Sequence, residues 1–166
     1  MTSVKTSDLY HMSSAEFSPC RRWRYTLWRW WDTGKDFTMV IGLNPSTADE
    51  MNDDPTVRRC IRFAHDWGYG GLCMTNIFAI RATNPKVMLA HPEPVGPEND
   101  SYLQDVSQKA GIIIAAWGVH GKHLGRGDAV AQMIPNLRCL GITKEGRPRH
   151  PLYLRADSKP IPFSSD

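Results

Sequence analysis

The sequence predicts an α/β domain in which helices cover both faces of a mostly parallel, four-stranded central sheet, with a β-hairpin added at its N-terminal end. Short apolar runs that stop at small or polar residues recur along the chain, and segments with helical spacing separate them. An aromatic-rich, partly alternating segment precedes the first run. With 166 residues, of which 41% are hydrophobic, the chain is long enough for one core. We therefore expect a single domain over residues 1–166, with residues 1–19 irregular.

The predicted hairpin joins the first two strands. Residues 22–31 interleave arginine with tryptophan, which is typical of a strand with one buried face. The same interleaving could bind nucleic acid by charge and stacking, and we consider this the weaker interpretation. A turn at residues 32–35 leads into a buried strand at 37–43, so the two strands are expected to pair. Pro45 cannot donate to a sheet and ends the second strand.

Helices and further strands alternate after this hairpin. Asp54 and Pro55 are typical of a helix start and Gly68 of a helix end. Buried strands are expected at residues 71–78, 112–117 and 137–142, helices from 99 or 100 to 110 and near 128–134, and a proline-rich loop at 81–97. The pattern favours parallel strands joined by helices.

Charge and cysteine content restrict the function classes. The net charge of +3 permits nucleic-acid binding without requiring it. The four cysteines form no Cys-x-x-Cys pair, and His120 and His123 have no carboxylate close in sequence, so we expect no metal site and no cofactor. Scattered cysteines, no apolar signal core and no apolar run of membrane-spanning length predict a cytoplasmic protein without membrane contact.

Polar side chains follow the ends of the predicted parallel strands. These ends share one edge of the sheet, where ligands bind in open α/β sheets, so Asn44, Asn76, Gly118 and His150 are expected to converge there. Two amides and an imidazole could recognise a polar planar ring and place a water molecule beside it. The alternative for residues 44–47 is a turn with a helix cap.

Four short motifs occur in the order found in a known group of enzymes. They are Gly-Leu-Asn-Pro-Ser at 42–46, Thr-Asn-Ile at 75–77, Ala-Trp-Gly at 116–118 and His-Pro-Leu-Tyr-Leu at 150–154. Together they resemble the motifs of the uracil-DNA glycosylase superfamily. The chain as a whole resembles more closely the DUF1643 family, which has no settled activity. That resemblance rests on Asn-Pro-Ser-Thr-Ala-Asp at 44–49, Asp-Asp-Pro-Thr at 53–56, Trp-Gly-Tyr-Gly at 67–70 and His-Pro-Leu-Tyr at 150–153.

The glycosylase resemblance implies an enzyme that flips a pyrimidine or modified pyrimidine out of single- or double-stranded DNA and hydrolyses its N-glycosidic bond. Asn44 would hold the attacking water, and His150 would stabilise the departing base. An amide cannot deprotonate water, so a carboxylate is needed, and Asp49 or Asp54 could supply it. We choose Asp49 as the catalytic candidate, because capping of the following helix is the more typical role for Asp54.

The same resemblance implies the binding residues. Asn76 would bind the base together with Gly42, Leu43 and Trp117. The DNA would contact Pro45, Ser46, Thr47, Pro151, Leu152, Tyr153, Arg147 and Arg149, with Leu152 or Tyr153 filling the gap left in the base stack. Two alternatives stay open: a nucleic-acid or nucleotide binding module without catalysis, and a hydrolase of free nucleosides or nucleotides. We expect a monomer.

Overall fold

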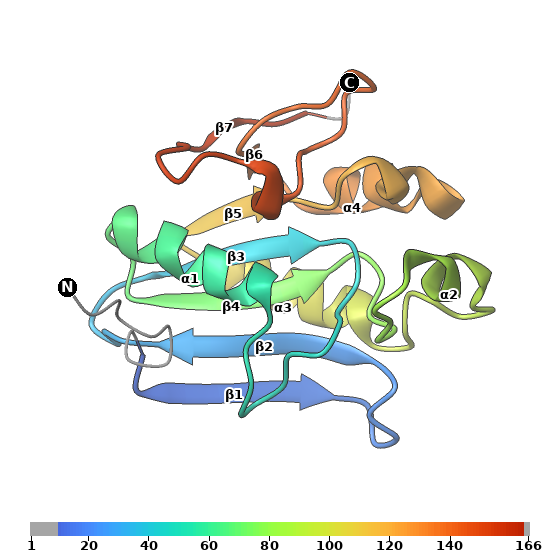
Figure 1. The fold of residues 1–166 in the computed structure, drawn as a ribbon, viewed down its shortest axis with the longest axis horizontal. Coiled ribbons are helices and arrows are strands. Elements are labelled where there is room, and N and C mark those ends of the chain that lie inside the picture. The colour runs from blue at the N-terminus through green and yellow to red at the C-terminus, as the bar shows by residue number, and fades with distance from the viewer. Residues whose placement is uncertain (1–9, 165–166) are drawn as a thin grey trace.

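One mixed sheet of seven strands organises the fold (Figure 1). The structure is a computed structural model that describes residues 10–164. The strands are β1 (Met12–Phe17), β2 (Arg24–Trp30), β3 (Phe37–Gly42), β4 (Gly71–Asn76), β5 (Ile112–Ala115), β6 (Arg138–Cys139) and β7 (Ile161–Pro162). Their spatial order is β1-β2-β4-β3-β5-β6-β7.

The α/β class is confirmed, but the predicted four-stranded, mostly parallel sheet is wrong. The four strands read from the apolar runs do form a parallel group, because β3 pairs in parallel with β4 and β5, and β5 with β6. Antiparallel strands extend this group on both sides, namely β2 and β1 on one and β7 on the other. Half of the neighbouring pairs among the described strands are therefore antiparallel.

The predicted hairpin between the first two strands does not form. β2 pairs antiparallel with β1 and with β4, so β4 lies between β2 and β3. Gly70, just before β4, accepts hydrogen bonds from the backbone of Trp31 and Asp32 and donates one to Asp36. A side chain at Gly70 would collide with the carbonyl oxygen of Asp32. This close approach lets β4 insert between two strands that are neighbours in sequence.

The expectation that residues 1–19 are irregular is wrong for the part that forms β1. Residues 12–17 form a strand along the edge of the sheet, while residues 1–9 lie outside the described part of the chain. Most side chains of β1 are exposed, so the strand lacks the apolar run by which the others were predicted.

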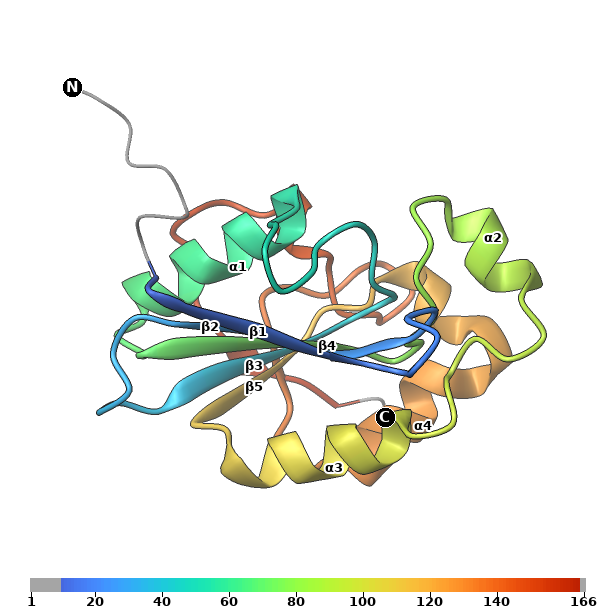
Figure 2. The ribbon, with the colours of Figure 1, turned by 90° about the horizontal axis from the view of Figure 1, so that it is seen from below.

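Helices cover both faces of the sheet, as predicted (Figure 2). α1 (Pro55–Asp66) lies on one face, and α3 (Asn99–Lys109) and α4 (Arg126–Met133) lie on the other. Two apolar clusters fill the two interfaces. One contains Val40, Val57, Ile61 and Met74 on the α1 side, and the other contains Met39, Leu103, Ile113 and Val130 on the far side. The alternation of Met39 and Val40 between the clusters follows from the two-residue period of β3.

Two arginines of β2 hold the loop that leads into α1. Arg29 forms an ion pair with Asp53 (Nε to Oδ1, 2.9 Å), and its Nη2 donates to the backbone oxygens of Asp49 and Asn52. Arg24 donates from Nη1 to the backbone oxygen of Ala48 at 3.0 Å. Both side chains are buried. Arg24 and Arg29 therefore stabilise a loop from inside the protein.

Short helical segments complete the fold. The expected loop at 81–97 contains α2 (Pro85–Ala90), which Asn84 caps. The 3₁₀ segment η2 (Val119–Gly125) follows β5, and the 3₁₀ segment η3 (Pro151–Tyr153) precedes β7. All four cysteines are unpaired. Of the helices in residues 10–164, none combines the length and the apolar character needed to span a membrane.

Candidate functional site

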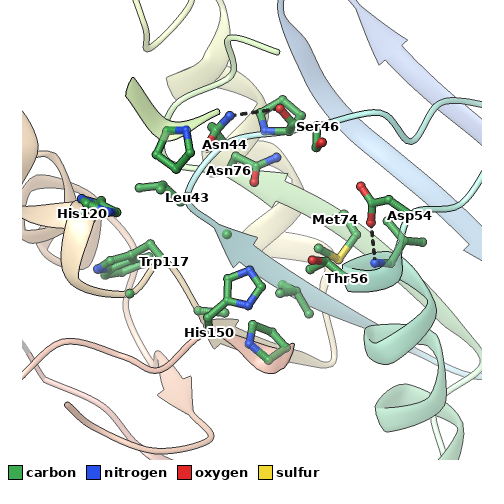
Figure 3. A pocket seen from close by; sticks show the side chains of 18 of the residues that line it. Leu43, Asn44, Ser46, Asp54, Thr56, Met74, Asn76, Trp117, His120 and His150 are labelled. Atoms are coloured by element: carbon green, nitrogen blue, oxygen red, sulfur yellow. Dashed lines mark hydrogen bonds between the residues drawn. The ribbon is translucent and has the colours of Figure 1, made fainter. Parts of the chain in front are cut away.

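A pocket opens at the carboxyl ends of the parallel strands. After β3 the chain moves to β4 on one side and then to β5 on the other, so the order of the strands reverses at β3. Ligands bind at such reversal points in open α/β sheets. The cavity there has a volume of about 540 Å³, within the range of pockets that enclose small organic ligands. Figure 3 shows its side chains converging from β3, β4, the start of α1 and η3.

The pocket brings together most of the residues predicted from the sequence. Its walls include Gly42, Leu43, Asn44, Pro45, Ser46, Asn76, Trp117, Arg149, His150, Pro151 and Tyr153. Four predicted residues, Asp49, Thr47, Leu152 and Arg147, do not line it. The sequence interpretation had left out Arg24 and Thr56, and had preferred a capping role for Asp54 over a catalytic one.

Asn44 joins two loops at the edge of the pocket. Its Nδ2 donates to the backbone oxygens of Pro45 at 3.1 Å and Ala82 at 2.9 Å, and the backbone N–H of Ala82 donates to Pro45. The donors of this amide are thus used within the protein. The oxygen Oδ1 is the atom that remains to accept a hydrogen bond from a water molecule.

Asn76 is the most distinctive polar group of the pocket. The residue is 3% exposed, and its Nδ2 has no hydrogen-bond partner among the described residues. Its backbone oxygen is fixed by Asn99, whose Nδ2 donates to it at 2.9 Å. Buried amides are almost always hydrogen-bonded in native proteins. A buried amide that lacks a partner at a pocket wall is therefore a candidate ligand contact.

Gly42 leaves room for the Asn76 amide. An alanine Cβ at position 42 would lie 2.8 Å from Oδ1 of Asn76, closer than real contacts of this kind. We expect Gly42→Ala to rotate the amide and weaken ligand binding at least several-fold, with a small change in thermal stability because only one side chain must move. Titration calorimetry and thermal unfolding of the two proteins test this. Unchanged affinity for the ligand would show that the amide orientation is unimportant.

Asp54 supplies the single carboxylate among the described residues that line the pocket. Its Oδ1 accepts the backbone N–H of Val57 at 2.8 Å, so it caps α1 as predicted. Asp49, to which we had assigned the catalytic carboxylate, is turned into its own loop. Its Oδ1 accepts from the backbone of Met51 and Asn52, and these hydrogen bonds lower its pKa. The carboxylate that lines the pocket is therefore that of Asp54 and not that of Asp49.

His150 faces Asp54 across the pocket (Figure 3). Its Nδ1 accepts the backbone N–H of Leu152 at 3.2 Å, which caps η3. Burial lowers the pKa of His150 from its ordinary value of 6.5, and the negative charge of Asp54 opposes this shift. His150 is therefore neutral at pH 7, and because Nδ1 is an acceptor, the proton is on Nε2. A neutral imidazole of this form can donate one hydrogen bond to a ligand oxygen.

The pH dependence of His150 follows from this geometry. Its folded-state pKa lies below the unfolded value, so the unfolded chain takes up the proton first as the pH falls. Its contribution to stability is complete above about pH 6.5 and declines as the pH falls below that value. We expect an NMR titration to give a pKa below 6.5 and the Nε2–H tautomer. A pKa above 6.5, or a proton on Nδ1, contradicts this assignment.

The remaining predicted residues lie in the wall of the pocket, at its opening or on the protein surface away from it. The ring of Trp117 is 2% exposed and packs beneath η2, so it offers no free face to a base. Tyr153 is 82% exposed at the mouth, and the neighbouring Leu152 is 43% exposed. Arg149 lines the mouth, whereas Arg147 forms an ion pair with Asp128.

Arg24 is the residue that sequence reasoning missed. It lies on β2, outside the parallel strands, yet its side chain reaches the pocket because β2 is next to β4. An arginine at the start of an aromatic-rich strand was the available signal, since a buried guanidinium requires partners. Residues 10–164 contain no group of three or more metal-ligating side chains that could hold an ion.

Comparisons with known proteins give one match. A family model described as "Protein of unknown function (DUF1643)" matches residues 24–152. The matched region includes β2 and all of the pocket-lining residues except Tyr153. No curated protein and no solved structure matches the chain.

Proposed function

Because the chain belongs to the DUF1643 family, whose description assigns no activity, we propose a function from the chemistry of its pocket. The protein is an N-glycosidic hydrolase that excises a pyrimidine or modified pyrimidine base from DNA. The observation that carries the proposal is the Asn76 amide, 3% exposed and with an unpartnered Nδ2. An amide both donates and accepts, as the edge of a pyrimidine does.

Three other pocket residues, Asp54, Asn44 and His150, supply the groups that hydrolysis needs. Asp54 accepts a proton from a water molecule that Asn44 Oδ1 helps to hold. The water oxygen bonds to the anomeric carbon as the bond from that carbon to the base nitrogen breaks. The base leaves with the bonding electrons and then takes up a proton from solvent. His150 donates from Nε2 to an oxygen of the base and stabilises the negative charge that develops there.

The rim supports a nucleic-acid substrate. Tyr153 and Leu152 project from a short 3₁₀ turn beside the mouth, and both are exposed. Apolar side chains in this position can occupy the gap that a flipped nucleotide leaves. Arg149 is exposed beside them and can contact a phosphate. The four motifs that resemble the uracil-DNA glycosylase superfamily also meet at this pocket, which favours the same chemistry.

A hydrolase of free nucleosides or nucleotides is the second candidate. It is favoured by the burial of two polar side chains in the pocket, because Asn76 is 3% exposed and Arg24 is 2% exposed. Small ligands that enter the pocket completely can reach both.

Base release from DNA tests the first proposal. Labelled single- and double-stranded DNA containing uracil, mismatched thymine, hydroxymethyluracil or phage-modified pyrimidines is incubated with the protein, and abasic sites are cleaved with alkali. We expect strand breaks at one of these bases and none with Asp54→Asn. Free nucleosides and nucleotides are analysed in parallel by chromatography. Base release from them alone favours the second candidate, and no release from any substrate with measurable DNA binding indicates a binding module.

A further inference from the structure

We infer that Arg24 binds an anionic oxygen group of the ligand, a phosphate or a carboxylate, inside the pocket. The identity of the rest of that ligand rests on the proposed function. The Arg24 guanidinium has more hydrogen-bond donors than it uses within the protein. Nη1 of Arg24 donates to the backbone oxygen of Ala48 at 3.0 Å, while the buried Nε has no partner. Nη2 also makes no hydrogen bond to any residue that the structure describes.

The neighbouring buried arginine shows what a purely structural role looks like. Arg29 lies on the same strand and holds the same loop, but its guanidinium has four acceptors. They are Oδ1 of Asp53 and the backbone oxygens of Trp28, Asp49 and Asn52. Arg29 does not line the pocket, and Arg24 does. The arginine with unused donors is thus the one that a ligand can reach.

The charges of the pocket favour an anion. Arg24 and Arg149 line it together with Asp54, while His150 is neutral at pH 7, so these groups sum to a positive charge. Asp54 lies close enough to attract Arg24, but the two form no direct ion pair within the described chain. Burial lowers the pKa of Arg24 to about 10, although the negative charge of Asp54 opposes this shift. An anion beside it would also favour the charged guanidinium.

The position of Arg24 defines which anion it can meet. The residue is 2% exposed, so a phosphate on the outside of a DNA duplex cannot reach it, and the anionic group must enter the pocket. The planar guanidinium has adjacent N–H donors that suit the paired oxygens of a phosphate or carboxylate. The source is either the phosphate of a nucleotide drawn into the pocket or a carboxylate on a modified base.

The test compares matched ligands by titration calorimetry. One pair is 2′-deoxyuridine and its 5′-monophosphate, and the other is uracil and 5-carboxyuracil. Inorganic phosphate is titrated separately. The wild-type protein is expected to bind one anionic member about 10–100-fold more tightly than its neutral partner, as for hydrogen bonds to charged groups. The pair that shows the preference identifies the source of the anion.

Three variants assign the preference. Arg24→Gln removes the charge but can still donate to Ala48, and it should abolish the preference. Arg24→Lys keeps the positive charge but lacks the planar guanidinium with its adjacent N–H donors, so it should retain a reduced preference for the anion. This variant also tests the inference if the glutamine variant fails to fold. Arg22→Gln removes an exposed charge two residues away and should leave the preference intact.

The inference is wrong if the wild-type protein binds the anionic and the neutral member of both pairs equally well. It is also wrong if the Arg24→Gln variant still prefers the anionic member. Failure of the proposed function gives a different result. In that case no base is released and the neutral ligands do not bind, while inorganic phosphate still binds in a way that depends on Arg24.

Discussion

Replacing Asp54 with asparagine is expected to lower the rate of base release by about 10²–10⁴-fold, the usual contribution of a general base. The fold should remain nearly as stable, because asparagine is as good an N-cap as aspartate and its oxygen can still accept the N–H of Val57. Asp54→Ala removes both roles and should cost about 1 kcal/mol of stability as well. Single-turnover base release and thermal unfolding separate the two effects.

Asp49→Asn is the matched control for this prediction. Asp49 carries the same carboxylate five residues earlier, but its Oδ1 is bound within its own loop and does not line the pocket. Its replacement should leave the rate close to wild type. If Asp54→Asn retains the wild-type rate, Asp54 serves only to cap α1 and another group must activate the water.

Replacing Asn76 with alanine is expected to weaken ligand binding and base release by at least about 100-fold, because a site that hydrogen-bonds a ligand discriminates strongly when those bonds are lost. The stability should change little or rise slightly. Leaving a buried donor unsatisfied costs about 1–3 kcal/mol, and the substitution removes such a donor. Binding isotherms and chemical denaturation measure the two effects.

Asn99→Ala provides the contrasting control. The Asn99 side chain is buried, and its Nδ2 donates to the backbone oxygens of both Asn76 and Ile77. Its loss should destabilise the fold. If Asn76→Ala instead destabilises the protein as much as Asn99→Ala does and leaves ligand affinity unchanged, Asn76 is a structural residue.

Local signals predicted the elements, and non-local ones decided their arrangement. The start of α1 could be predicted because Asp54 and Pro55 act on adjacent backbone groups. The apolar runs gave the parallel strands. The pairing of β2 could not be predicted, because the contact at Gly70 that places β4 between β2 and β3 joins residues almost 40 positions apart. β1 carries an exposed pattern and lacks an apolar signal altogether.

The site shows the same division. Asn44 and Asn76 were predicted because each follows or ends an apolar strand, and His150 was predicted through the motif at 150–154. Asp49 and Asp54 could not be distinguished by residue type, since both stand in one acidic stretch, and only the folded loop turns Asp54 toward the pocket. Arg24 was missed because it enters from a strand whose neighbour was wrongly assigned.

The proposed function depends on the binding of a pyrimidine by the Asn76 amide. The most direct measurement follows the side-chain N–H resonances of Asn76 by NMR, assigned with Asn76→Ala, while 2′-deoxyuridine or deoxyribose is added. We expect a saturable shift of these resonances with the nucleoside and none with the sugar alone. A saturable response elsewhere in the protein with the Asn76 resonances unmoved would contradict it.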